Sequence, residues 1–296
     1  FKQKTAYEIM PSLVGSEMCI RDSSITILIL GLLLSCSEEK VSEVSEEHEK
    51  GPFYVEFVSC TKGNEFSKSN LSKMIESWRM LPTSSELRGS YLYDPIKEEN
   101  AFGPSMWWEL EWESKDAADS AWSDWTENEE VMAWSNEFQN VMSCDGAGRN
   151  AWDILIPVAA SHFGELNHSG YFYSQYWTCS YKNGAGRNEM ENFLPMHSAK
   201  IKSSNLQGTG YHYGVYFDRR SADASHSDVQ ANLVWGEWAN SKDAMELQNQ
   251  NFANNFQEVF EEFDKLGSCL EEPDTFNSWM LYTKDSPDDS DYSPKF

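Results

Sequence analysis

Two histidines are the side chains best suited to acid–base chemistry in this chain of 296 residues. His197 falls on the apolar stripe of an expected helix, and His212 sits on an expected strand among tyrosines. An imidazole in such a place could act as a general base or as a haem ligand. A lone histidine on a core face is more often a packing residue, so both interpretations stay open.

Glu111 and Glu237 form a second pair of candidates for catalysis. Each is followed by tryptophan and then, within a few residues, by Ser-Lys-Asp-Ala, which predicts matching positions on two matching strands. Carboxylates sharing a dry space between facing sheets would raise one pKa and create an acid/base pair. The flanking Glu109 and Glu113 favour the other interpretation, in which both candidates face solvent or pair with Arg or Lys.

Aromatic side chains crowd the expected strands. They could wall a pocket for a flat apolar ligand or a sugar. Large aromatics also suit packing between two sheets, so the same residues are candidates for the core. The candidate ligand contacts are Trp108, Trp112, Tyr213, Trp235 and Trp238.

The chain contains two copies of one sequence pattern, and such a duplication fixes architecture before chemistry. The matched features are Cys60 with Cys179, Glu111-Trp112 with Glu237-Trp238, Ser114 to Ala117 with Ser241 to Ala244, Cys144 with Cys269, and Trp152 with Trp279.

Each copy shows the same order of expected elements. Strands are expected at 53–60, 90–94, 106–113 and 151–157, and again at 171–180, 211–217, 231–239 and 276–283. Helical apolar stripes follow the first and third strand of each copy, which makes the order β-α-β-β-α-β, the split ferredoxin-like unit.

This order, present twice, resembles the dimeric α/β-barrel superfamily, whose members pair two such sheets face to face. The resemblance implies an α+β fold in which tandem ferredoxin-like units, residues 52–160 and 161–284, form one pseudo-dimeric α/β barrel. The superfamily includes cofactor-free monooxygenases, haem-using enzymes and proteins that only bind. No catalytic signature in this chain selects among them, and no cofactor is expected.

Four cysteines fall at matching places in the two copies, and three pairings are conceivable. The repeat favours Cys60–Cys144 and Cys179–Cys269, each joining the first strand of a copy to the end of its second helix. An oxidising compartment outside the cytoplasm would permit these disulfides. A zinc site or reactive thiols are the alternatives. No CxxC pair and no histidine at ligand spacing lies nearby, so no metal site is expected.

The ends of the chain predict a location in the bacterial cell envelope. Residues 1–23 resemble the translation of a sequencing adapter from metagenomic assemblies and are not expected to belong to the fold. Residues 24–35 fit the remnant of a signal peptide, whose apolar run is too short for the ~20 residues that span a bilayer. Leu33-Leu34-Ser35-Cys36 resembles a bacterial lipobox, which implies lipidation of Cys36 and transfer to the outer membrane. Residues 36–51 then form an acidic tether, and residues 285–296 an acidic tail.

The charge balance excludes some partners. The 23 basic and 48 acidic side chains give a formal net charge of -25, so no basic stripe exists to bind nucleic acid. We therefore expect an exported outer-membrane lipoprotein of the bacterial envelope that binds a small apolar or aromatic ligand between its sheets, or an envelope protein partner. A monooxygenase-like enzyme that uses His197 or His212 is the rival, and a structural envelope protein is the third alternative. The lack of a catalytic signature favours binding over catalysis.

Overall fold

The computed structural model describes residues 51–97, 103–164, 170–206, 209–219, 231–284 and 296. The predictions for the adapter-like segment, the signal peptide, lipidated Cys36 and the acidic tether therefore lie outside the described residues. So does almost all of the acidic tail.

The first unit has the predicted order of elements with two additions. Its second helical region is divided in two at Asn128, whose side chain accepts hydrogen bonds from the first turn of the second helix. A short strand also follows that helix. The elements are β1 (Phe53–Lys62), α1 (Lys68–Trp78), β2 (Leu87–Pro95), β3 (Met106–Trp112), α2 (Lys115–Glu127), α3 (Glu129–Phe138), β4 (Met142–Cys144) and β5 (Asn150–Leu155).

The second unit repeats this order, after a short connecting helix α4 (Ala160–Phe163). Its elements are β6 (Tyr171–Tyr181), α5 (Arg187–Ser203), β7 (His212–Asp218), β8 (Leu233–Ala239), α6 (Lys242–Asn255), α7 (Gln257–Leu266), β9 (Gly267–Cys269) and β10 (Asp274–Thr283).

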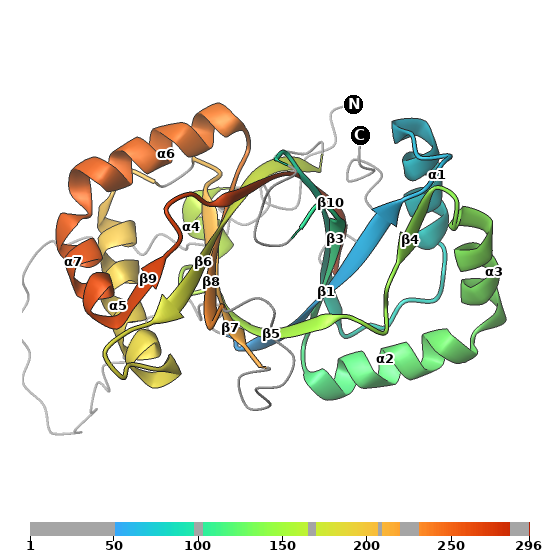
Figure 1. Ribbon diagram of the computed structural model, residues 1–296, viewed down its shortest axis with the longest axis horizontal. Helices are drawn as coiled ribbons and strands as arrows, with labels where there is room; N and C mark the ends of the chain where they lie inside the picture. Colours follow the sequence, from blue (N-terminus) through green and yellow to red (C-terminus); the bar gives the residue numbers. More distant parts are fainter. Residues whose placement is uncertain (1–50, 98–102, 165–169, 207–208, 220–230, 285–295) are drawn as a thin grey trace, which may run out of the picture. The chain divides into compact units, whose positions relative to one another are not determined.

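The two sheets join edge to edge into one closed barrel (Figure 1). Among the described residues, the barrel runs β2-β3-β1-β5-β7-β8-β6-β10 and returns to β2, with all pairs antiparallel. The seams are β5 with β7 and β10 with β2, so each sheet donates its outer strands to the other. Helices α1, α2 and α3 cover one side of the barrel and α5, α6 and α7 the opposite side. The predicted fold of two ferredoxin-like units in one α/β barrel is confirmed.

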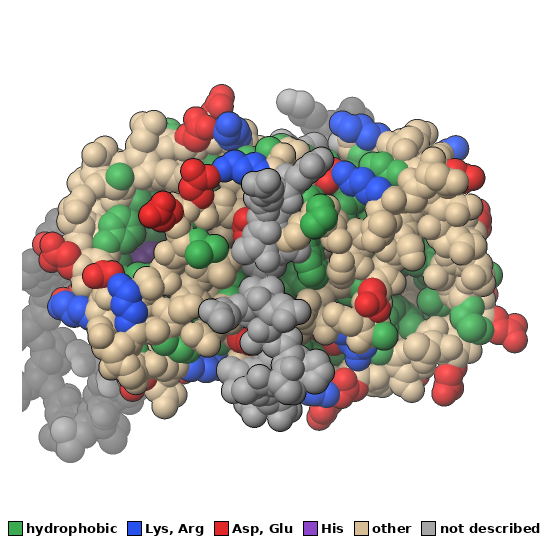
Figure 2. Space-filling model, in the orientation of Figure 1, with side chains coloured by type: hydrophobic (Ala, Val, Ile, Leu, Met, Phe, Trp, Pro, Cys, Tyr) green, Lys and Arg blue, Asp and Glu red, His purple; other side chains and the backbone are tan. Residues whose placement is uncertain are grey.

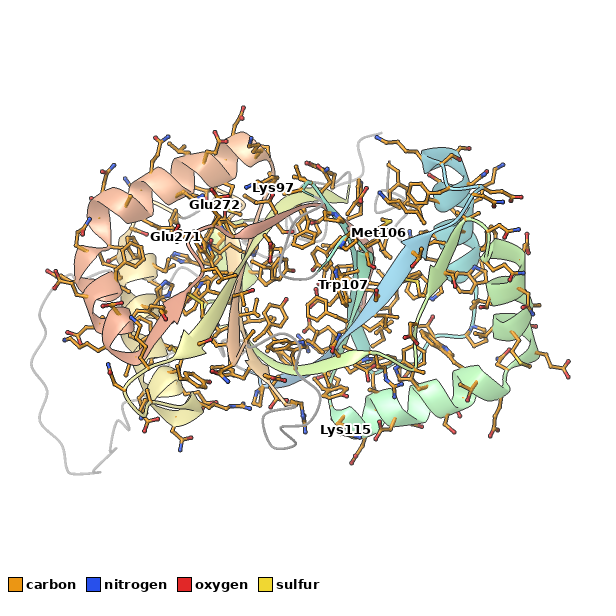
Figure 3. All side chains as sticks on the ribbon, viewed as in Figure 1. Lys97, Met106, Trp107, Lys115, Glu271 and Glu272 are labelled. Atoms are coloured by element: carbon orange, nitrogen blue, oxygen red, sulfur yellow. A yellow bond between two sulfur atoms is a disulfide. The ribbon has the colours of Figure 1, made fainter. Side chains whose placement is uncertain are left out.

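Three apolar clusters follow from this arrangement. One lies between β-sheet and helices in each unit, and the third fills the barrel. Because successive residues of a strand point to opposite faces, Met106 of β3 packs under the helices while its neighbour Trp107 faces the barrel interior (both labelled in Figure 3).

Both predicted disulfides are present. Cys60 of β1 is bonded to Cys144 of β4, and Cys179 of β6 to Cys269 of β9, each pair lying directly opposite in its antiparallel ladder. Each bond fixes the short strand that follows the helices against the first strand of its own unit.

The strand registers correct two of the matches expected between the copies. Cys60 pairs with Met106 and Cys179 with Leu233, so counting along the strands matches Glu237 with Leu110, and Glu111 with Trp238. The prediction that Glu111 and Glu237 are equivalent is therefore wrong by one residue.

The last strands show a similar error. Trp152 faces Val55, and Phe276 faces Ser174, the residue that corresponds to Val55. Trp152 therefore matches Phe276. Trp279 instead packs into the helix-side core of the first unit.

No helix in the described ranges is long and apolar enough to cross a membrane.

Candidate functional site: a cavity under the helices of the second unit

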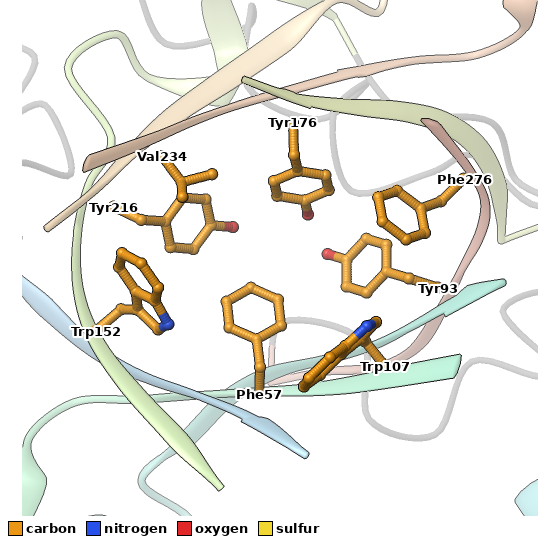
Figure 4. Close-up of a pocket in the computed structure, with 8 residues that line it drawn as sticks. All are labelled: Phe57, Tyr93, Trp107, Trp152, Tyr176, Tyr216, Val234 and Phe276. Atoms are coloured by element: carbon orange, nitrogen blue, oxygen red, sulfur yellow. The ribbon is translucent and has the colours of Figure 1, made fainter. Parts of the chain in front are cut away.

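The barrel interior is nearly full. Aromatic side chains converge on its centre (Figure 4) and leave a cavity of only about 20 Å³. A single water needs roughly 10–15 Å³ of such space. A ligand between the sheets, as expected from the sequence, has no room there. The side chains around this small cavity are Phe57, Tyr93, Trp107, Trp152, Tyr176, Tyr216, Val234 and Phe276.

Two glutamates of β3 face this interior. Glu109 is 2% exposed and accepts hydrogen bonds from the hydroxyls of Tyr93 and, at 3.0 Å, Tyr216. Burial raises the pKa of Glu109 to about 8. Glu111 lies nearer the rim, where its Oε1 accepts from Arg88 Nε at 2.8 Å. Pairing of Glu111 with an arginine is one of the outcomes expected from the sequence.

A much larger cavity, about 380 Å³, lies between the sheet and the helices of the second unit. Figure 2 shows hydrophobic side chains around a hollow with a histidine in it, on the side of the molecule that carries α6 and α7. Phe260, 45% exposed, belongs to the lining and places part of it at the surface. The full lining is Trp177, Phe193, His197, Trp235, Glu237, Asn249, Phe252, Ala253, Phe256, Val259, Phe260, Phe263 and Cys269.

The first unit has large side chains where the second unit has this space. Helices α1 and α5 begin after the N-caps Ser67 and Gly186, and counting from these caps places His197 at the position of Trp78. The ring contacts support this match. The ring centroids of Trp78 and Trp108 lie 5.1 Å apart, and those of His197 and Trp235, the residue that matches Trp108, lie 4.7 Å apart.

Helices α2 and α6 show the same change. Ser114 and Ser241 cap them identically, each accepting a hydrogen bond from the alanine three residues later. Counting from these caps matches Trp122 with Asn249. An indole in the first unit is thus replaced by a short amide, which leaves space between helix and sheet.

A third tryptophan is lost between α3 and α7. Trp134 of α3 precedes strand β4 by the same number of residues as Val259 of α7 precedes strand β9, so the two residues occupy matching positions. Trp177 changes in the other direction, since it matches the smaller Val58 and adds an aromatic wall. The second unit therefore has an aromatic-walled cavity at a place that tryptophans occupy in the first.

Glu237 is the acidic group of this cavity. It is 6% exposed, and its Oε1 accepts from the Tyr211 hydroxyl at 2.7 Å. Its Oε2 accepts from Trp177 Nε1 at 3.0 Å and from Gln175 Nε2. Burial raises the pKa of Glu237. Asn249 extends the polar group by donating to Gln175 Oε1 at 3.2 Å.

His197 is the second titratable group of the lining. Its Nδ1 lies 3.3 Å from the Tyr213 hydroxyl, and no partner for Nε2 is found among the described residues. Burial lowers the pKa of His197 to about 3, so the imidazole is neutral at physiological pH. A neutral ring can accept a proton or donate a lone pair to a ligand.

The remaining candidates divide between the cavity and the core. Trp235 lines the cavity, and Tyr213 stacks on Trp235 at 5.8 Å. Trp108 and Trp112 are buried in the core of the first unit, and Trp238 lies in the barrel, where it donates to the Tyr176 hydroxyl at 3.1 Å.

His212 lies outside the cavity lining. Its Nε2 is 2.9 Å from the backbone oxygen of Gly164, and burial lowers its pKa to about 4. The structure therefore brings His197, Glu237 and Trp235 together and leaves His212 and Glu111 elsewhere. Among the described residues, no group of three or more His, Cys, Asp or Glu is arranged to hold a metal ion.

Asn249 and Gln175 were not candidates from the sequence. Amides in a helix and a strand carry no chemical signature by themselves. Comparison of the two copies could have found Asn249. It follows Ser241 by the same number of residues as Trp122 follows Ser114, so the first copy has a tryptophan where the second has an amide.

No protein-family model matches the chain, and no curated protein matches it. Solved structures of similar fold include a protein from Fusobacterium nucleatum that is provisionally classed as a monooxygenase (13% identity, 77% of this chain and 91% of that chain, TM-score 0.46). They also include the chlorite dismutase of Candidatus Nitrospira defluvii in complex with imidazole (8%, 78% and 92%, TM-score 0.46) and an anthrone oxidase-like protein (11%, 80% and 97%, TM-score 0.42). At identities this low the similarity concerns the fold alone.

Proposed function

We propose that this chain binds a small, largely apolar or aromatic molecule in the cavity of its second unit. The cavity volume of about 380 Å³ falls in the range of roughly 300–1,000 Å³ common for small-molecule sites. Its lining is mostly aromatic with a few polar groups, which is the usual composition of such sites. The observation that carries the proposal is that the first unit has tryptophans at the matching positions.

Ligand occupancy can be tested directly by native mass spectrometry of the purified full chain, together with its absorption spectrum. A discrete excess mass or a chromophore band supports an occupied cavity. Binding in solution is then measured by titration with the uncharged fluorescent probe N-phenyl-1-naphthylamine.

The decisive variant is Asn249→Trp, which restores the indole of the first unit. We expect it to abolish probe binding and leave the fold intact. Leu247→Trp is the matched control, because Leu247 is 62% exposed on the same helix. Equal binding by the two variants and the original chain would contradict the proposal.

We place this binding function in an exported lipoprotein held to the outer membrane through Cys36. The two disulfides support export, because such bonds persist mainly in oxidising compartments. The test is mass analysis of the N-terminal peptide from envelope fractions. A diacylglyceryl modification of Cys36 is expected, and its absence, with the chain found in the cytoplasm, would contradict this placement.

A monooxygenase-like enzyme is the second candidate, and His197 is the observation that favours it. A neutral imidazole with an open Nε2 on a cavity wall could remove a proton from a bound substrate. If the cavity only binds, His197→Gln should change affinity by about threefold or less and there is no turnover to lose. Turnover that disappears in this variant would establish the enzyme.

The fold family also includes haem-using enzymes. The lining offers His197 as an axial nitrogen, but its described residues include Glu237 and no Lys or Arg to receive the two haem carboxylates. This set of residues does not fit a dianionic macrocycle, and it fits a neutral or cationic ligand better.

A further inference from the structure

Each unit buries one carboxylate between its sheet and its helices, and the two carboxylates differ in the groups that bond to them and balance their charge. In the first unit, Glu56 is fully buried and paired with Arg149, whose Nε lies 2.7 Å from Oε1. Trp122 Nε1 donates to Oε2 at 2.5 Å and the Tyr54 hydroxyl donates to Oε1 at 3.1 Å. A cation inside the protein thus balances this charge.

In the second unit, Gln175 takes the place of Glu56, and the carboxylate moves across to Glu237 on β8. The donors to Glu237 are a phenol, an indole and an amide, all of them neutral. Among the described residues, no Lys or Arg forms an ion pair with Glu237. A buried carboxylate without a cation is costly when it is ionised.

The hydrogen bonds to Glu237 leave room for one more. A carboxylate has about four acceptor positions, and donors from the described part of the chain fill three. Because Glu237 lines the cavity, a bound molecule can supply both the missing donor and the missing positive charge.

The rest of the lining suits a cation as well. Aromatic faces attract ammonium groups within about 6 Å of the ring centre. One ring of the lining, Phe256, already has Lys200 Nζ 5.8 Å from its centroid. Trp177 and Trp235, two further rings of the lining, are tryptophans, the aromatic side chains that bind cations best.

We propose that the ligand of this cavity is an organic amine, with an apolar or aromatic body between the helices and an ammonium group on Glu237. This inference rests on the proposed binding function and specifies the class of molecule bound. In the first unit, Arg149 and Trp122 take the roles that the ammonium group and the ligand body take in the second.

The experiment compares 2-phenylethylamine, which is an ammonium ion at neutral pH, with uncharged 2-phenylethanol of the same size. We expect the original chain to bind the amine about tenfold or more tightly than the alcohol, as a desolvated charge pair predicts. Glu237→Gln should remove this preference, so that the variant binds the amine and the alcohol with about equal affinity. Near-ultraviolet circular dichroism checks that the variant is folded.

A second variant keeps the test decisive if Glu237→Gln does not fold. Asn249→Lys places a cation beside the same polar group, as Arg149 does for Glu56, and should abolish the preference for the amine. Equal affinity of the original chain for both compounds, or a preference for the amine that survives in a folded variant, overturns the inference while the binding function stands. Failure of every probe, including the naphthylamine, would overturn the binding function itself.

Discussion

Asn249 of α6 occupies the position that Trp122 holds in α2. In the first unit the indole packs on the sheet and donates to buried Glu56, while in the second unit the amide bonds to Gln175 and leaves the space beside it open. Duplication gave both units one framework, and this exchange separates a unit with a filled core from a unit with a cavity.

The filled core of the first unit depends on Trp122. Trp122→Ala removes a large packed side chain, the donor to Glu56 and the ring that Arg149 stacks on at 4.8 Å. We expect the free energy of unfolding to fall by about 3–5 kcal/mol, as measured by urea denaturation. Probe binding in the second unit should not change, and a parallel loss of binding would show that the cavity is not confined to one unit.

Glu109 should make the protein less stable as the pH rises from 6.5 to 8. Its folded pKa of about 8 lies above the ordinary value of 4.5 for a glutamate, so in this window the folded state holds a proton that the unfolded state has lost. The free energy of unfolding then falls by up to about 1.4 kcal/mol per pH unit from this group.

Glu109→Gln should flatten that slope, and an unchanged slope would show that Glu109 does not hold the proton. His197 and His212, whose pKa values are lowered by burial to about 3 and about 4, act in the opposite direction at the acidic end of this window, and the comparison of the variant with the original chain removes their contribution because both proteins share it. These histidines bind protons only in the unfolded chain and make stability rise with pH mainly below about 6.5. Glu237 acts in the same direction as Glu109, so the comparison between variant and original chain isolates Glu109.

His212 should matter for stability and leave binding unaffected. His212→Ala removes the partner of the Gly164 carbonyl and a ring that packs 5.5 Å from Phe163. We expect a loss of about 1 kcal/mol or more in the free energy of unfolding. Affinity for the naphthylamine probe should stay within error, since His212 does not line the cavity. A selective loss of affinity or turnover at unchanged stability would return His212 to the functional site.

The sequence predicted much of this architecture, because the duplication repeats each signal. Matched cysteines indicated the disulfides, and serine caps and apolar stripes indicated the elements. The alignment of the third strands failed because Glu-Trp occurs in both copies one residue out of register. A shift of one residue sends a strand side chain to the opposite face, so Glu237 lies under the helices while Glu111 lies in the barrel. The cavity could not be predicted from one motif, because it arises from smaller side chains at several helix positions together.

The two disulfides provide a further test of the cavity. Each should stabilise its own unit, but the Cys179–Cys269 bond alone of the two should affect ligand binding. They close loops with sequence separations of 84 and 90 residues, and a loop of that length stabilises by about 4–5 kcal/mol in the chain-entropy treatment. We expect each double Cys→Ser variant, at Cys60/Cys144 or at Cys179/Cys269, to lose stability on that scale in urea denaturation.

Only the second disulfide borders the cavity, through Cys269. The Cys179/Cys269 variant should therefore bind the naphthylamine probe more weakly under conditions in which it is still folded. The Cys60/Cys144 variant serves as the matched control, since its bond lies in the unit whose core is filled. If both variants lose affinity equally, probe binding depends on overall stability instead of on the walls of the cavity, and the site must be sought elsewhere.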